Sequence, residues 1–196
     1  MCTTPPPARS SARWARRLPP TRSSSRRCPE MAPAPGSITL FLALLLAGSA
    51  LHKGLAHERL AIAAARLAGT RPSSGPLLLL TAGSVEAVAA ACLLITPLQR
   101  TGALIAAALW LGYAIALFRR RGEVLDCGCD LVAREKPVTL AQTARPALLA
   151  LAAGLVSTLP AAAFGIETPF AAAGLCALYL GISELLAIPQ PAWRKP

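Results

Sequence analysis

Long uncharged apolar stretches are the feature that most constrains how this chain can fold. A helix of roughly 20 apolar residues crosses the hydrocarbon core of a bilayer. Five blocks of about that length occur, at approximately 36–54, 77–96, 101–118, 138–159 and 169–188. Backbone groups in lipid must be satisfied internally, so each block is predicted to be helical. The sequence therefore predicts an all-α integral membrane bundle of four to five transmembrane helices. The count stays open because Gln142, Arg145 and Pro146 interrupt the fourth block.

Composition supports a bilayer as the surrounding medium. Hydrophobic residues make up 54% of the chain and charged residues 15%, whereas a soluble domain has roughly 25% charged residues. The net charge of +11 comes from arginines in the N-terminal tail and beside the apolar blocks. This placement is typical of membrane proteins. Because no basic stripe carries interleaved aromatic residues, we exclude nucleic acid as a partner.

Three regions follow from the distribution of residue types. Residues 1–30 are rich in Pro, Ser and Arg and are predicted to be a disordered tail. No apolar segment precedes Met31, so the tail is not a secretory signal, and Met31 is an alternative translation start that would leave it untranslated. Residues 31–190 form the predicted membrane domain, and 191–196 a short C-terminal tail. Between the first two blocks, residues 60–68 are predicted to form an amphipathic helix at the interface.

Reactive groups are concentrated in one short segment, Asp126-Cys127-Gly128-Cys129-Asp130, which follows the third block. A disulfide across one residue closes a strained ring, and a strained disulfide is readily reduced. The pair is therefore predicted to act as a thiol–disulfide relay. Two alternatives remain open: two thiolates can capture copper(I), or the cysteines are inert in a structural subunit. Neighbouring arginines favour the thiolate, whereas Asp126 and Asp130 oppose it.

Four polar residues inside or beside the apolar blocks are candidates for a supporting role. Glu86 lies halfway along the second block, where an unpaired carboxylate is costly. It is predicted to accept protons, or to bond Ser49, His52 or Lys53 at the end of the first block. Lys53 is expected to extend towards the headgroups, and His52 could bind a metal or move protons. We call Asp126–Asp130 the thiol segment. Arg145 either pairs with an acid of this segment or, if its helix starts later, is merely interfacial.

Several short motifs occur together in one order along the chain. They are Gly-Ser-Ala-Leu-His-Lys at 48–53, Val-Glu-Ala at 85–87, Asp-Cys-Gly-Cys at 126–129 and Val-Thr-Leu-Ala-Gln-Thr-Ala-Arg at 138–145. In these motifs the chain resembles, over roughly 38–159, the MauE/DoxX-like family of redox-associated membrane proteins, typified by the methylamine utilisation proteins. That family usually continues Cys-Gly-Cys with Phe-Gly, whereas Asp130-Leu131 follows here.

The resemblance implies a multi-pass protein of the bacterial inner membrane that supports disulfide formation or maturation of exported proteins. It also implies a thioredoxin-like partner and a link to methylamine metabolism. Cys127 and Cys129 would be the reacting thiols, and the supporting residues would be Asp126 and the four polar residues named above. No cofactor is predicted, and whether the protein is itself an enzyme is left open.

The orientation of the chain is predicted differently by two criteria. Basic residues number eight on the side of the N-terminus and twelve on the side of the thiol segment. Starting at Met31 changes this to one against twelve, which places the thiols in the cytoplasm by the positive-inside rule. The family role instead implies an exported face.

Overall fold

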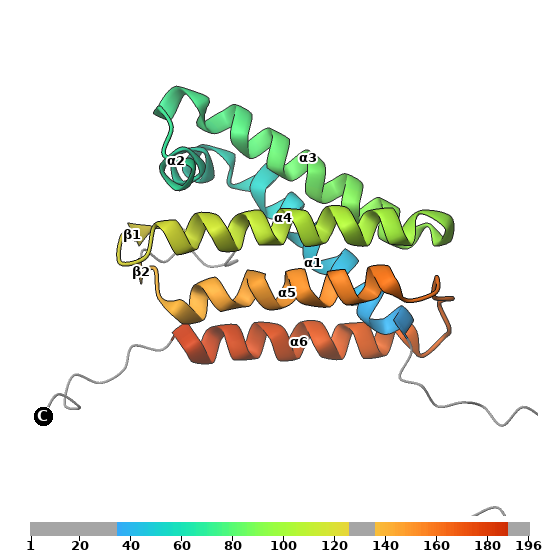
Figure 1. Ribbon diagram of the computed structural model, residues 1–196. Coiled ribbons are helices and arrows are strands. Elements are labelled where there is room, and N and C mark those ends of the chain that lie inside the picture. Colours follow the sequence, from blue (N-terminus) through green and yellow to red (C-terminus); the bar gives the residue numbers. More distant parts are fainter. Residues whose placement is uncertain (1–34, 126–135, 188–196) are drawn as a thin grey trace, which may run out of the picture. The chain divides into compact units, whose positions relative to one another are not determined.

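The computed structural model describes residues 35–125 and 136–187 (Figure 1). Five helices in these ranges are long and apolar enough to cross a membrane. They are α1 (Pro35–Leu55), α3 (Gly75–Leu94), α4 (Gln99–Arg119), α5 (Leu140–Thr158) and α6 (Thr168–Ala187). The predicted all-α membrane bundle is confirmed, with the higher of the two predicted span counts. The tails predicted at 1–30 and 191–196 lie outside the described residues.

Short elements occupy the connections between these helices. They are α2 (His57–Ala68), the 3-10 turns η1 (Pro72–Ser74) and η2 (Thr96–Leu98), and the strands β1 (Val124–Leu125) and β2 (Lys136–Pro137). The helix predicted at 60–68 is confirmed as α2, although it begins earlier. Gly69 ends α2 in the left-handed conformation, with φ of 69°, which glycine adopts without steric cost.

The irregular fourth block forms a helix because its N-terminus is well capped. Thr139 Oγ1 accepts a hydrogen bond from the backbone N–H of Gln142, and Gln142 Oε1 accepts one from the N–H of Thr139. This reciprocal capping box satisfies two N–H groups that a helix start leaves unpaired. Pro146 is contained within α5. Arg145 therefore lies inside the helix, and the alternative in which the helix starts after it is wrong.

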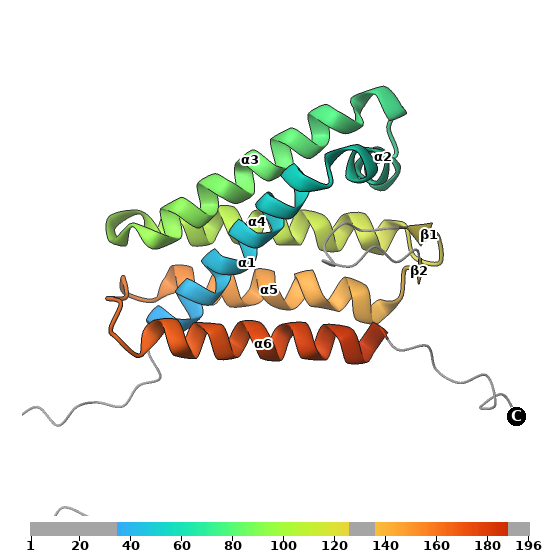
Figure 2. The ribbon, with the colours of Figure 1, turned by 180° about the vertical axis from the view of Figure 1, so that it is seen from behind.

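Helices α4, α5 and α6 lie alongside one another in both views, and α1 crosses them obliquely (Figures 1 and 2). Helix α1 packs against α3, α5 and α6, while α4 packs against both α3 and α5. Successive spans alternate in direction, so the bundle has two distinct ends. We call the end with the α3–α4 and α5–α6 connections the turn end. The opposite end, where α1 finishes and β1 pairs with β2, is the loop end.

The turn half of the bundle is tightly packed with small side chains. Its core is Leu42, Ala43 and Leu46 of α1, Ala89, Ala90 and Leu93 of α3, Ala103, Ala106 and Trp110 of α4, and Ala153 and Val156 of α5. Small residues allow helix backbones to approach closely within a membrane. At Gly102 the approach is close enough that an added Cβ would lie 2.7 Å from the backbone nitrogen of Leu93.

A side chain also ties the two connections together at the turn end. The amide of Gln99 donates to the carbonyl oxygen of Ala162 at 3.0 Å and accepts from the N–H of Ala162 at 2.8 Å. Gln99 is buried, so both of its polar ends are satisfied away from solvent. The start of α4 is thereby fixed to the segment that leads into α6.

Burial is inverted relative to a soluble protein. Leu80, Leu148 and Phe170 are 68%, 64% and 77% exposed, whereas Glu86 is 1% exposed. A soluble monomer rarely exposes large apolar surfaces of this kind. An apolar exterior with ionisable residues facing the interior is the pattern of helices surrounded by lipid.

Candidate functional site

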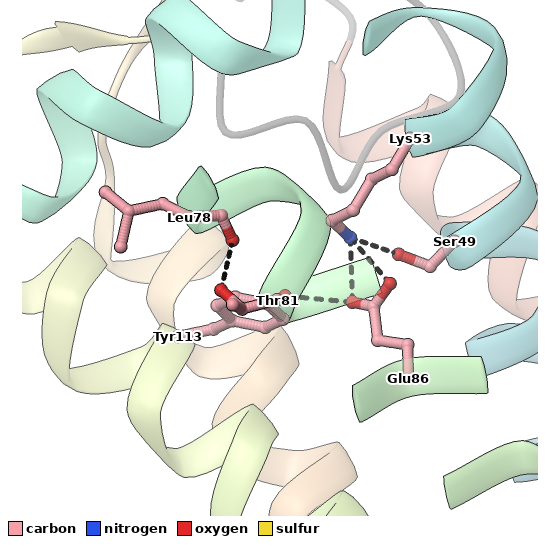
Figure 3. A network of polar contacts seen from close by, with 6 residues as sticks. All are labelled: Ser49, Lys53, Leu78, Thr81, Glu86 and Tyr113. Carbon is pink, nitrogen blue, oxygen red and sulfur yellow. Dashed lines mark hydrogen bonds and ion pairs between the residues drawn. The ribbon is translucent and has the colours of Figure 1, made fainter. Parts of the chain in front are cut away.

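A buried ion pair joins α1 to α3 in the loop half of the bundle (Figure 3). The Nζ of Lys53 lies 2.7 Å and 2.8 Å from the two carboxylate oxygens of Glu86. The exposed fractions of the two side chains are 9% and 1%. Two charges at this depth attract strongly because little water screens them. Lys53 is thus the observed partner among the three predicted for Glu86.

Two further hydroxyl groups complete this network. Lys53 Nζ also donates to Ser49 Oγ at 2.7 Å, one helical turn earlier in α1. The hydroxyl of Tyr113 in α4 donates to Glu86 Oε1 at 2.9 Å, and Lys53 Nζ lies 5.5 Å from the centre of the Tyr113 ring. All three ammonium protons have acceptors, and one carboxylate connects α1, α3 and α4. A buried ion pair is stable only when its remaining bonds are satisfied in this way.

The expectation that Lys53 extends towards the headgroups is wrong. Its side chain turns into the bundle, where Glu86 and Ser49 accept its protons. Sequence position favoured the opposite outcome, because lysines near helix ends usually place the ammonium in water. The buried carboxylate reverses this preference, since leaving Glu86 charged without a partner would cost more than burying Lys53 beside it.

A cavity of about 210 Å³ adjoins the network. Its polar lining includes His52, Glu86, Tyr113 and Arg145, and its aromatic lining includes Trp110 and Tyr179. These residues come from α1, α3, α4, α5 and α6, and most lie in the loop half of their helices. The structure therefore gathers His52, Glu86 and Arg145 around one space, with Lys53 bonded to Glu86 at its edge.

His52 differs from the other polar residues of this lining. Its Nε2 is buried and has no hydrogen-bond partner among residues 35–125 and 136–187. A buried polar atom without a partner is costly, so each such atom calls for an explanation. Over the same ranges no group of three or more His, Cys, Asp or Glu residues gathers into a metal site. His52 is also one of the residues that line the cavity.

Arg145 connects the two C-terminal helices. One of its guanidinium nitrogens donates to the backbone carbonyl of Ser183 in α6 at 2.9 Å. Ser183 lies in the last part of α6, near the loop end. The predicted pairing of Arg145 with an acid of the thiol segment falls outside the described residues, as do Asp126, Cys127 and Cys129 themselves.

The residues that flank 126–135 on both sides are described. β1 pairs antiparallel with β2, and Leu125 stands opposite Lys136 in the register. The N–H of Gly122 also donates to the carbonyl of Val138, and the N–H of Val138 donates to the carbonyl of Glu123. Leu125 and Lys136 therefore lie side by side, between the end of α4 and the start of α5.

Sequence reasoning missed the aromatic members of the site. The chain has two tyrosines, Tyr113 and Tyr179, and both line the cavity. Trp110, one helical turn before Tyr113, lines it as well. Their rarity in Ala/Leu-rich blocks was the available signal, since a buried tyrosine hydroxyl usually requires a hydrogen-bond partner. Cys176 is half-buried in α6 and also contributes to the lining.

Comparison with known proteins places this arrangement in one family. The model of the methylamine utilisation protein MauE family matches residues 31–159, more than half of the 196-residue chain. No curated protein and no solved structure was found to match. The matched region runs from α1 to α5 and includes the ion pair and the thiol segment, whereas α6 lies beyond it. With five membrane-length helices and this match, the chain is a multi-pass membrane protein that belongs to the MauE family.

Proposed function

We propose that this protein is the membrane component of a thiol–disulfide exchange system. In it, Cys127 and Cys129 carry a disulfide that they exchange with a soluble thioredoxin-like partner. The observation that carries the proposal is the position of the Cys-Gly-Cys motif inside the family-matched region, in a segment whose two ends are tied together by β1 and β2. The residues on either side of the motif are thereby held together at the loop end of the bundle.

The exchange conserves atoms and electrons. A thiolate of the partner attacks one sulfur of the Cys127–Cys129 disulfide, and the other sulfur leaves as a thiolate. The second partner thiolate then resolves the mixed disulfide. The partner is thereby oxidised to a disulfide, and the membrane protein is left with two reduced cysteines. Ring strain across a single glycine favours this direction of transfer.

The described polar residues support this role as a scaffold for the loop half of the bundle. Lys53, Glu86 and Tyr113 hold α1, α3 and α4 together in the loop half, and Arg145 holds α5 to α6. Because Glu86 already accepts bonds from both Lys53 and Tyr113, we assign it to anchoring. The imidazole of His52 is the better candidate for moving protons, since its Nε2 has no hydrogen-bond partner among the described residues. The bacterial inner membrane and methylamine utilisation are the proposed setting.

The test is a Cys127→Ser, Cys129→Ser variant assayed in cells for oxidation of the thioredoxin-like partner. We expect the partner to accumulate in its reduced form, while the amount of membrane protein stays unchanged. Cys92→Ala is the matched control, because Cys92 is a half-buried free thiol in α3. Full partner oxidation by the double variant would refute the exchange function. Stoichiometric copper in the purified wild-type protein, lost in the double variant, would favour metal handling instead.

A further inference from the structure

The cavity in the loop half has the size of a small ring-shaped molecule. Its volume is about 210 Å³, and an engineered apolar cavity of roughly 150 Å³ admits benzene. A six-membered ring with two carbonyl oxygens therefore fits. Its walls include Trp110, Tyr113 and Tyr179, whose faces and edges favour offset or edge contacts with another planar ring.

The polar lining favours a ligand that accepts hydrogen bonds. The negative charge of Glu86 is matched by Lys53, so the carboxylate does not call for a cation. His52 Nε2 has no partner among residues 35–125 and 136–187. Because the χ2 torsion of histidine is soft, a modest rotation of the ring presents this nitrogen to the cavity. A carbonyl oxygen of the ligand would then accept a hydrogen bond from the imidazole. The Arg145 guanidinium, another hydrogen-bond donor, lines the same cavity.

Part of the cavity wall reaches the apolar exterior of the bundle. Leu44 of α1 and Leu180 of α6 both line it, and they are 45% and 42% exposed on the apolar exterior. These two leucines mark a lateral boundary between α1 and α6 that consists of apolar side chains. A ligand that reaches the cavity by this route must be soluble in lipid.

The proposed exchange supplies the chemical need for such a ligand. Each disulfide passed to a partner leaves Cys127 and Cys129 reduced, and restoring their disulfide releases two electrons and two protons. We propose that the cavity binds the headgroup of a membrane quinone, which accepts these electrons and protons and becomes a quinol. This inference rests on the proposed function for its electron source, but the binding of the quinone does not depend on the thiols.

Binding is measured first, in purified protein. Trp14→Phe and Trp193→Phe leave Trp110 as the single tryptophan, and decylubiquinone is titrated while its fluorescence quenching is followed. We expect saturable quenching, and an affinity at least tenfold weaker in His52→Leu. His52→Gln, which keeps a donor, should lose less than threefold. His57→Leu is the matched control, because His57 is exposed in α2 and does not line this cavity.

Two further measurements distinguish specific binding of the quinone headgroup from nonspecific partitioning of its apolar tail. Decylbenzene, which lacks the carbonyl groups, should not displace decylubiquinone; equal competition would show only apolar partitioning and would overturn the proposal. Equal affinities in wild type and His52→Leu, or no saturation at all, would overturn it too. Thermal unfolding of each variant establishes whether it is folded. If His52→Leu is not folded, the comparison of wild type with His52→Gln is used instead.

Electron transfer is measured second. Reduced protein mixed with decylubiquinone should yield one quinol and one Cys127–Cys129 disulfide per chain, and His52→Leu should slow this reaction. The Cys127→Ser, Cys129→Ser variant should bind the quinone normally and produce no quinol. Binding without quinol formation by the wild-type protein would overturn the acceptor role. Failure of partner oxidation in cells alone would count against the proposed function and leave the quinone site standing.

Discussion

Lys53 and Glu86 are 33 positions apart in the chain, and they form a two-point ion pair at 2.7 Å and 2.8 Å inside the bundle. The pair holds the last turn of α1 against the middle of α3. It also lies beside the cavity that His52 and Arg145 line. The same two residues therefore determine both helix packing and the charge balance of the site.

Removing one partner of this pair should be severely destabilising. Lys53→Met leaves a buried carboxylate without its cation, and a loss of about 3–5 kcal/mol is typical. Thermal unfolding in detergent measures the effect. The Lys53→Met, Glu86→Leu double variant should recover most of the loss, because it leaves no unpaired charge. Arg120→Gln is the matched control, since the Arg120–Glu123 pair is exposed at 3.2 Å and such pairs contribute about 0–1 kcal/mol. Equal effects at the two sites would contradict the packing described.

Tyr113→Phe should cost less than Lys53→Met. It removes one hydrogen bond to Glu86 Oε1, which contributes roughly 1.5–3 kcal/mol when its acceptor is charged. The ring stays 5.5 Å from Lys53 Nζ, so the cation–π contact is retained. Tyr113→Leu removes both interactions and should unfold at a still lower temperature. Identical unfolding temperatures for Phe and Leu at this position would mean that the ring contributes nothing.

Gly102→Ala should destabilise the α3–α4 hairpin. A Cβ at this position would meet the backbone nitrogen of Leu93 at 2.7 Å and the Cβ of Cys92 at 2.9 Å, and overpacking of this kind costs about 1–3 kcal/mol. Gly112→Ala in the same helix is the control, because a Cβ there meets no atom within 4 Å. It should be neutral or stabilising, since alanine favours helix. The unfolding temperatures of the two variants decide the matter; a tolerated Gly102→Ala would show that the helices can separate.

Five spans place the turn end and the loop end on opposite faces of the membrane. In a variant with all six native cysteines replaced, Arg100→Cys and Arg121→Cys should react with membrane-impermeant thiol reagents added to opposite faces. Arg100 is at the start of α4, and Arg121 just follows its end. Ala106→Cys, in the buried core of α4, should react from neither face. Labelling of both arginine positions from one face would disprove a spanning α4. The face that labels Arg121→Cys is also the face of the thiol segment.

Much of the fold was predictable because each membrane-spanning helix corresponds to a continuous apolar segment of about 20 residues. The five blocks and the amphipathic α2 follow from the hydropathy pattern. Whether the fourth block would form a membrane-spanning helix was harder to predict. There the Thr139–Gln142 capping box secures the start of a helix that Arg145 and Pro146 made doubtful.

The site was predictable only in part, because its geometry depends on how the helices rotate against one another. Glu86 was recognisable as a buried acid in need of a partner, and Lys53 was among the partners predicted. The sequence did not predict that the Lys53 side chain points into the bundle or that Tyr113 bonds Glu86. Both depend on which faces α1, α3 and α4 present to each other. The roles of Cys127, Cys129 and Asp126 stay predictions.

The match to the family ends at residue 159, yet α6 supplies Cys176, Tyr179 and Leu180 to the cavity wall. One side of the cavity is therefore contributed by a span outside the matched region. Two proteins that shared the first five helices but differed in this final one would have cavities of different shape. The ligand preference of the proposed quinone site would thus change by exchange of a single helix, with the thiol segment left intact.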